Sequence, residues 1–238
     1  MLSGKPWRTE AVIQFCAVQF ACLLLGVALA GLLHKFGVAG FKHDDDFGNI
    51  LLATLSFQGV TWILIPIFLR QHQMRWHRAF GFEKSNGLRA LILAVSVLIV
   101  VLPIALLLEN LSVLALQKIG WQLEEEAAVK LFTAAKLWPT GIYLGVFAIV
   151  IAPVAEEFIF RGMLFPFVKQ LGFPKLAWLG VSFLFALIHA DAAIFIPLFL
   201  LALALTWLYE KTDNLLAPIF AHALFNLANL VILVFAPK

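Results

Sequence analysis

Charged residues are scarce in this chain of 238 residues: lysine, arginine, aspartate and glutamate make up 13% of it, whereas 63% is hydrophobic. Soluble domains average about 25% charged residues. No polar stretch is long enough to form a separate soluble domain, so the composition predicts one polytopic, all-α membrane domain over residues 1–238. The formal net charge of +3 is small and scattered, which argues against nucleic acid as a partner.

Cysteine is also scarce, because Cys16 and Cys22 are the only two in the chain. Six residues apart on a helix, their side chains point in different directions, which makes a disulfide between them implausible. Several catalytic motifs are absent as well. The chain has no His-Glu-x-x-His run, no Gly-x-Ser-x-Gly serine and no pair of aspartates within an apolar run. These absences argue against the hydrolase chemistries that depend on those motifs.

Long apolar runs predict about seven membrane-spanning helices, with a range of six to eight. The expected helices cover residues 11–33, 47–69, 88–116, 138–168, 174–189, 194–208 and 216–235. The sixth is short for a full span. Pro103 and Pro153 fall inside the third and fourth helices, where each removes a backbone donor and predicts a local kink.

The loops predict the orientation of the chain. Basic residues concentrate between the second and third helices, which predicts that this loop and the N-terminus are cytoplasmic. The expected location is the cell (inner) membrane. His72 and His77 in the same loop are expected to contact lipid headgroups rather than a metal ion. Residues 117–137 mix glutamates with apolar residues, and this segment is expected to be an amphipathic helix on the outer surface. Alternatively, it covers the entrance to an active site.

The fourth expected helix carries three ionisable residues, Glu156, Glu157 and Arg161, within an otherwise apolar run. A charged side chain at bilayer depth costs about 2.5–3.5 kcal/mol on insertion scales, so such groups pair or perform chemistry. Glu157 and Arg161 lie four residues apart on one helix face and can form an ion pair. Glu156 lies about 100° around the helix and has no partner at that spacing. This leaves Glu156 available for chemistry.

Two more polar groups follow downstream: His189 near the end of the fifth helix, and His222 with Asn226 on one face of the seventh. One such histidine is explained by packing, but a carboxylate, two histidines and an amide on three helices are costly for packing alone. The set suits amide hydrolysis, since a carboxylate can take a proton from water and the other groups can stabilise an oxyanion. Alternatively, Glu156, His189 and His222 hold a zinc ion whose bound water attacks.

Together, these residues resemble the motifs of a known family. Glu-Glu-x-x-x-Arg, Phe-x-x-x-His and His-x-x-x-Asn occur in order at Glu156–Arg161, Phe185–His189 and His222–Asn226. They resemble those of the CAAX-protease and bacteriocin-processing (Abi) family of intramembrane proteases, which includes the type II CAAX prenyl endopeptidases. The resemblance covers residues 149–230, the expected protease core. It implies an endopeptidase that cuts a membrane-associated peptide or protein.

The resemblance also implies a role for each motif residue. Glu156 would activate water together with His189, and His222 with Asn226 would hold the oxyanion. The neighbouring carboxylate and arginine of the first motif would shape the site. The family is often described as metallo-, but a metal-free glutamate mechanism has been argued for its eukaryotic-type relatives, so a bound zinc stays an open alternative.

Two other functions stay open beside the protease. A non-catalytic immunity or scaffolding protein would keep the polar core for packing, and a Glu156→Gln variant would then retain its cellular activity. A transporter or proton relay would use the same carboxylate and histidines, and it would show ion flux in liposomes without a cleaved product. The complete set of three motifs favours the protease over both.

Overall fold

The apolar runs form helices, because a backbone in hydrocarbon must satisfy its own polar groups. A computed structural model describes residues 2, 4–43, 46–82, 87–121 and 138–235. Every regular element in these ranges is helical, which confirms the predicted all-α fold. Six of these helices are long and apolar enough to cross a membrane. The amphipathic helix predicted over residues 117–137 falls, from residue 122 onward, outside the described residues.

The helices follow the expected ranges closely. The first half of the chain forms α1 (Thr9–Lys35), α2 (Phe47–Thr54), α3 (Val60–Gln71), α4 (Trp76–Phe80) and α5 (Gly87–Lys118). The second half forms α7 (Trp138–Val146), α8 (Ala152–Glu157), α9 (Phe165–Gln170), α10 (Pro174–Leu187), α11 (Phe195–Thr212) and α12 (Leu216–Phe235). The short apolar helix is α10, with 14 residues, whereas α11 has 18 and meets the length of a span. The two cysteines of α1 are free thiols.

In the described ranges, three π-helical segments widen the long helices: η1 (Leu55–Gly59), η3 (Phe147–Ile151) and η4 (Phe158–Leu164). A π-segment shifts the backbone hydrogen-bond register, and such segments are frequent at functional sites. The segments η3 and η4 lie on either side of α8, so the irregularity expected near Pro153 takes the form of widened turns.

A side chain from elsewhere in the chain donates to a carbonyl of each π-segment. The donors are Gln19 to Ser56 and Phe57 (3.3 and 3.1 Å), Asn226 to Ala148 (2.8 Å) and the Trp7 indole to Gly162 (3.0 Å). In a membrane these carbonyls have no water to accept from, so the donors help to stabilise the widened turns.

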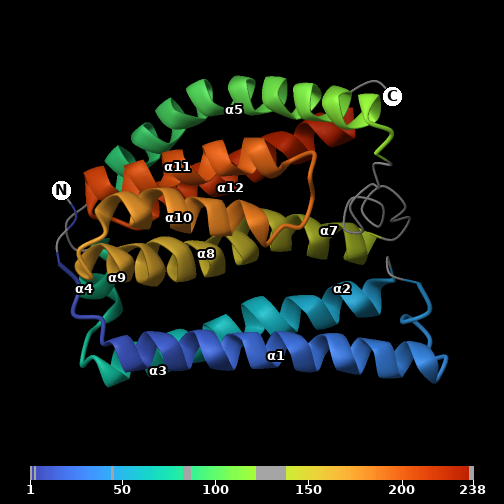
Figure 1. The fold of residues 1–238 in the computed structure, drawn as a ribbon, viewed down its shortest axis with the longest axis horizontal. Helices are drawn as coiled ribbons and strands as arrows, with labels where there is room; N and C mark the ends of the chain where they lie inside the picture. Colours follow the sequence, from blue (N-terminus) through green and yellow to red (C-terminus); the bar gives the residue numbers. More distant parts are fainter. Residues whose placement is uncertain (1, 3, 44–45, 83–86, 122–137, 236–238) are drawn as a thin grey trace.

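Figure 1 shows α1, α2 and α3 along one side of the bundle and α5 arching over α11 and α12 on the other. Between them run α7, α8, α9 and α10. The last helix, α12, packs against α5, η3 and α8, while α11 packs against α5, α10 and α12. Pro103 lies within the curved α5. This arrangement brings α8, α10, α11 and α12 together around one set of side chains.

The segment before α1 is built into the core. Lys5 pairs with Asp213 at 3.1 Å, with side chains only 2% and 9% exposed. Next to this pair, the Leu215 N–H donates to the carbonyl of Phe80 at 2.9 Å. Gly81 turns with φ +75°, and a Cβ there would lie 1.7 Å from the Asp213 carbonyl oxygen. The N-terminal segment, α4 and the turn between α11 and α12 are therefore tightly packed together.

Candidate active site

The predicted ion pair of Glu157 and Arg161 lies at the centre of the cluster. Arg161 Nη1 donates to Glu157 Oε1 at 2.7 Å, and both side chains are fully buried. Arg161 also donates from Nη2 to the carbonyl of Ala202 at 3.1 Å and from Nε to Thr206 Oγ1 at 3.4 Å. Its guanidinium carbon lies 4.6 Å from the centroid of the Phe185 ring. Each nitrogen of the buried cation thus has an acceptor, which such a group requires.

His222, on the neighbouring helix α12, contacts this pair. Its Nδ1 lies 2.9 Å from Glu157 Oε1. Because a carboxylate can only accept, Nδ1 carries the proton and donates it. The other ring nitrogen, Nε2, faces Glu156 Oε2 at 3.9 Å. His222 is therefore held in one orientation by Glu157 and presents its second nitrogen to Glu156.

Glu156 differs from its neighbour in its surroundings. Its side chain is 11% exposed, whereas that of Glu157 is fully buried. Within the part of the chain that the structure describes, no hydrogen bond reaches the Glu156 carboxylate, while Glu157 Oε1 accepts two. Glu156 is thus a nearly buried carboxylate beside an imidazole, with its acceptor sites open.

His189 lies at the edge of the cluster, two residues beyond the end of α10. Its Nδ1 donates to the carbonyl of Phe185 at 2.7 Å, which leaves Nε2 with its lone pair free. The Phe185 ring centroid lies 4.9 Å from that of His189 and 5.6 Å from that of His222. Phe185 therefore packs between the two histidines. His189 lies within electrostatic range of Glu156 but makes no direct bond to it.

Asn226 does not join the cluster in this structure. It lies one turn beyond His222 on α12, and its Nδ2 donates to the carbonyl of Ala148 in η3 at 2.8 Å. One of its two amide hydrogens is used in this bond. The structure thus brings Glu156, Glu157, Arg161 and His222 together, with His189 at the edge, while Asn226 connects α12 to η3.

Two hydroxyls that support the arginine were not predicted from the sequence. Thr206 of α11 donates to the carbonyl of Ala202 at 2.8 Å and accepts from Arg161. Ser182 of α10 lies 3.4 Å from the Thr206 hydroxyl. Both are fully buried. Their signal in the sequence is weak: they are single hydroxyls in apolar helices, where such groups usually bond within their own helix.

The prediction for His72 is wrong. Its Nδ1 donates to the carbonyl of Phe68 at 2.7 Å, and its Nε2 accepts from the backbone N–H of Arg8 at 2.9 Å. Both ring nitrogens are occupied within the protein, so neither is available to bond a headgroup or a metal ion in this structure. It connects the C-terminal end of α3 to the start of α1.

The donor set does not fit the zinc alternative in this arrangement. A zinc ligand atom lies about 2.0–2.2 Å from the metal, so Glu156, His189 and His222 would have to converge on one point. Glu156 and His222 face each other, but His189 does not complete the set. Among the described residues, no three His, Cys, Asp or Glu side chains are grouped closely enough to hold a metal ion.

The fold and the site define a polytopic membrane protein with a buried carboxylate–arginine–histidine cluster. Residues 138–228 match the family model described as type II CAAX prenyl endopeptidase Rce1-like. This match confirms, for residues 138–228, the family resemblance predicted from the three motifs.

One curated relative supports this assignment. The UPF0177 protein YxdF of Lactococcus lactis subsp. lactis (strain IL1403) is 33% identical over 79 residues, which are 33% of this chain and 43% of that protein. The match thus spans less than half of the relative's length. No solved structure matches the chain.

Proposed function

We propose that this protein is an intramembrane endopeptidase that hydrolyses a peptide bond, in or near the bilayer, of a membrane-associated peptide or protein. One observation carries the proposal: two adjacent glutamates lie in different environments. Glu157 is bonded to Arg161 and His222, whereas Glu156 is free of hydrogen bonds and faces an imidazole. This difference in environment suits Glu157 to a structural role and Glu156 to a chemical one.

In this proposal Glu156 is the general base. Its carboxylate accepts a proton from a water molecule while the water oxygen attacks the carbonyl carbon of the peptide bond. The tetrahedral intermediate then collapses, the carbon–nitrogen bond breaks, and Glu156 returns the proton to the leaving nitrogen. His189 orients the attacking water through the free lone pair of its Nε2. The slight exposure of Glu156, beside the full burial of Glu157, supports this assignment because the base must meet water.

His222 and Asn226 are proposed to stabilise the oxyanion. Because Nδ1 of His222 donates to Glu157, only a protonated Nε2 could donate to the oxyanion, and the ring would then be an imidazolium. A buried carboxylate bonded to Nδ1 stabilises that cation, as in hydrolase triads. Asn226 would donate with its second amide hydrogen while the first stays on Ala148. These donors act where negative charge develops, which is the general basis of oxyanion stabilisation.

The membrane setting follows from the helices, but its orientation is part of the proposal. The chain is an integral membrane protein, and its described residues include six apolar helices long enough to span a membrane. We place its N-terminus in the cytoplasm and the protein in the cell (inner) membrane, because the loop before α5 is the most basic of the chain. The substrate is accordingly expected to be a CAAX-type or other membrane-anchored peptide.

The test is cleavage of tagged membrane peptides, prenylated and unprenylated, by the purified full-length protein in proteoliposomes. Glu156→Gln keeps the shape of the side chain and removes its basicity, and we expect about a 10²–10⁴-fold loss of rate. Glu210→Gln is the matched control, because it makes the same change at a partly buried carboxylate of α11 that pairs with Lys169 outside the cluster. Its cleavage rate should equal that of the unmodified protein.

Other results would redirect the proposal. Full cleavage by Glu156→Gln would remove Glu156 as the base. A cellular activity that survives Glu156→Gln, with no peptide cut by any form, would favour an immunity or scaffolding role. Ion flux without cleaved product would favour a transporter. Zinc should be quantified on the same samples, since stoichiometric zinc that is lost in His222→Ala would favour a metal-bound water as the nucleophile.

A further inference from the structure

A second feature lies on a different face of α11 from the cluster, about 100° around the helix. The face that carries Ala202 and Thr206 contacts Arg161, whereas the face that carries Leu203 and Trp207 borders a groove against α5 and α10. The groove has a volume of about 460 Å³, which is within the range of about 300–1,000 Å³ typical of ligand sites. It lies between α5 and α11, which are long enough to span a membrane, and the shorter apolar helix α10, and it shares no lining residue with the candidate active site.

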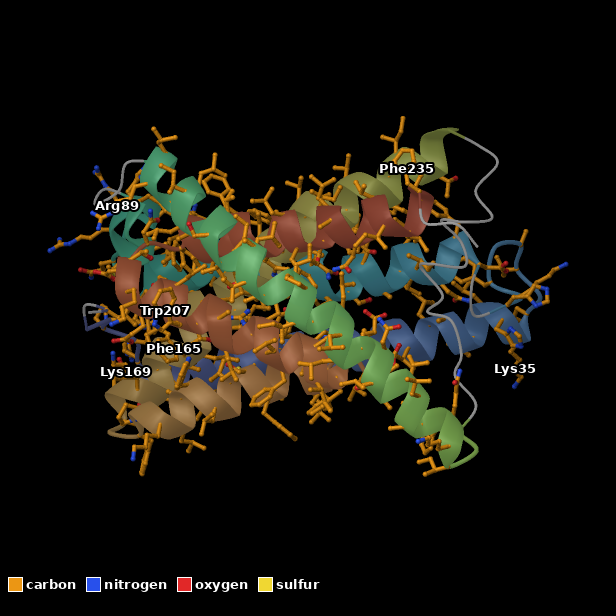
Figure 2. The ribbon with its side chains drawn as sticks, turned by 90° about the horizontal axis from the view of Figure 1, so that it is seen from above. Lys35, Arg89, Phe165, Lys169, Trp207 and Phe235 are labelled. Carbon is orange, nitrogen blue, oxygen red and sulfur yellow. The ribbon has the colours of Figure 1, made fainter. Side chains whose placement is uncertain are left out.

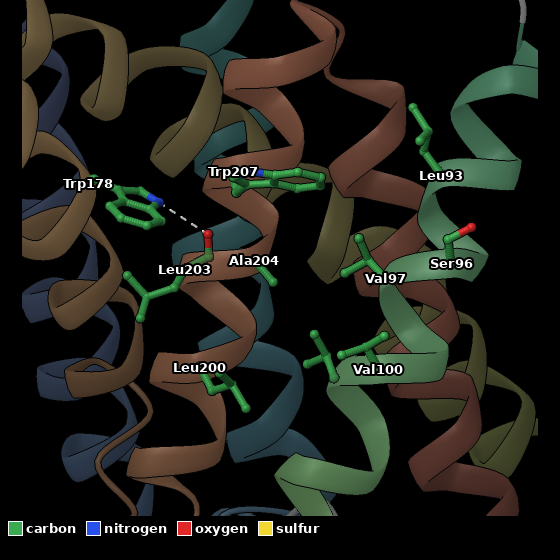
Figure 3. A pocket seen from close by; sticks show the side chains of 10 residues that line it. Leu93, Ser96, Val97, Val100, Trp178, Leu200, Leu203, Ala204 and Trp207 are labelled. Carbon is green, nitrogen blue, oxygen red and sulfur yellow. Dashed lines mark hydrogen bonds between the residues drawn. The ribbon is translucent and has the colours of Figure 1, made fainter.

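The wall of this groove is suited to a hydrocarbon chain. Its only lining hydroxyl, that of Ser96, donates within its own helix to the carbonyl of Ile92 at 2.9 Å. The indole of Trp178 donates to the carbonyl of Leu203 at 3.2 Å and so joins α10 to α11. Figure 3 shows this bond and places Trp178, Trp207 and Leu93 toward one end of the groove, with Leu200 and Val100 toward the other. The groove therefore offers aliphatic walls that end in two indoles.

Three basic residues lie beyond the end of the groove that carries the indoles. Each helix that lines the groove carries an exposed basic residue one turn beyond a lining residue, at the same end of the bundle. These are Arg89 four residues before Leu93 on α5, Lys175 three residues before Trp178 on α10, and Lys211 four residues after Trp207 on α11. Residues three or four apart share a helix face, so all three cations lie on the groove side of their helices. Figure 2 shows Arg89 and Trp207 at the same end of the molecule.

The two described acidic residues next to Lys211 have other partners. Glu210, next to Lys211, is held by Lys169 with both carboxylate oxygens 2.6 Å from Nζ. Asp213 is held by Lys5. Within the described ranges, no ion pair engages Arg89, Lys175 or Lys211. Along the groove, the aliphatic wall, the two indoles and the three cations follow one another in the same order as the acyl chain, the interface and the phosphate of a lipid.

We propose that this groove binds one acyl chain of an anionic phospholipid, whose phosphate is contacted by Arg89, Lys175 and Lys211. The indole N–H of Trp207, which has no hydrogen-bond partner in the part of the chain described, lies where it can donate to the lipid headgroup. The three cations favour an anionic lipid over a zwitterionic one. An acyl chain held in the groove should also exchange more slowly than the surrounding lipids. The bound lipid joins α5 to α11, the helix that supports Arg161 from a different face.

The proposal can be tested by native mass spectrometry of the full-length protein in detergent, with an equal mixture of palmitoyl-oleoyl phosphatidylglycerol and phosphatidylcholine. Phosphatidylglycerol should be the retained lipid. Each cation near an anionic lipid contributes about five-fold in affinity, so the double variant Arg89→Gln, Lys211→Gln should lower its retention about 25-fold. The matched control is Lys118→Gln, which removes an exposed cation from the opposite end of α5 and should change nothing.

A groove-filling variant tests the position of the acyl chain. Ala204→Trp places a large ring among the lining residues and should abolish retention of phosphatidylglycerol, while Leu107→Trp, at a 59% exposed position of α5, should not. Equal retention of the two lipids, or equal loss in the charge variants and in Lys118→Gln, would overturn the proposal. So would a dimer that is weakened by Ala204→Trp and indifferent to lipid, because a second copy would then fill the groove. If Ala204→Trp fails to fold, the charge variants alone decide.

Discussion

Neutralising one member of the buried ion pair is the perturbation whose magnitude the structure predicts best. Glu157 and Arg161 are 0% exposed and 2.7 Å apart, so neither charge is screened by water. Removing one partner of a buried pair leaves the other uncompensated and costs about 3–5 kcal/mol. We therefore expect Glu157→Gln to lower the free energy of unfolding by about 3–5 kcal/mol, since the amide still accepts hydrogen bonds but carries no charge.

The double variant separates the pair energy from the loss of packing. Arg161→Met removes the cation and keeps much of the side-chain volume, and alone it should also cost about 3–5 kcal/mol. When both changes are combined, no uncompensated charge is left from this pair. The double variant should then be more stable than the sum of the single effects predicts, by at least about 2 kcal/mol, which is in the range of coupling energies for contacting residues.

The assay is unfolding in mixed micelles with increasing dodecyl sulfate, followed by fluorescence of the seven tryptophans. Glu210→Gln is the control, because it breaks the Lys169–Glu210 pair, whose side chains are 30% and 27% exposed. A pair in contact with solvent is worth at most about 1 kcal/mol. The reasoning fails if Glu157→Gln costs no more than Glu210→Gln, or if the two changes at the buried pair are additive.

Two further predictions concern the packing that positions the site, and both are measured by the same unfolding assay. Gly81→Ala should destabilise the fold by about 2 kcal/mol more than Gly172→Ala, because both glycines have positive φ but only the Cβ at Gly81 meets backbone, the Asp213 carbonyl. Equal effects would contradict that contact. Trp7→Phe keeps an aromatic ring and removes the donor to the Gly162 carbonyl, so it should cost about 1 kcal/mol, and an unchanged stability would show that this bond contributes nothing.

Relations within one helix were predictable from the sequence, whereas relations between helices were not. The pairing of Glu157 with Arg161 follows from their spacing of four residues and is present. The bond from His222 to the same carboxylate joins residues 65 apart, and no periodicity indicates it. His222 and Asn226 share a helix face, which suggested a common role, but His222 bonds to Glu157 whereas Asn226 bonds to Ala148. A shared helix face determines the direction in which both side chains point. The packing of the helices determines which neighbour each side chain contacts.

Charged residues near the helix ends were the hardest to interpret. Lys5 comes before the first apolar run, yet it is buried against Asp213, which lies 208 positions later in the sequence. The sequence shows a charge beside an apolar run, and both a solvated flank and a buried pair satisfy that description. Distinguishing them requires the fold, because the partner of Lys5 comes from the turn between α11 and α12.

The π-segments explain why one residue of the candidate site serves the fold as well as the proposed chemistry. Pro153 lies between η3 and the glutamates and removes a backbone donor, and the widened turn of η3 leaves the Ala148 carbonyl to be satisfied by Asn226. This bond ties α12 to the helix of Glu156, and so it helps to fix His222, one turn away, opposite the carboxylates. If Asn226 also holds the oxyanion, it must use its second amide hydrogen. The spacing of four residues between His222 and Asn226 then serves both the fold and the proposed chemistry. It lets one face of α12 contact the glutamates through His222 and the widened turn of η3 through Asn226.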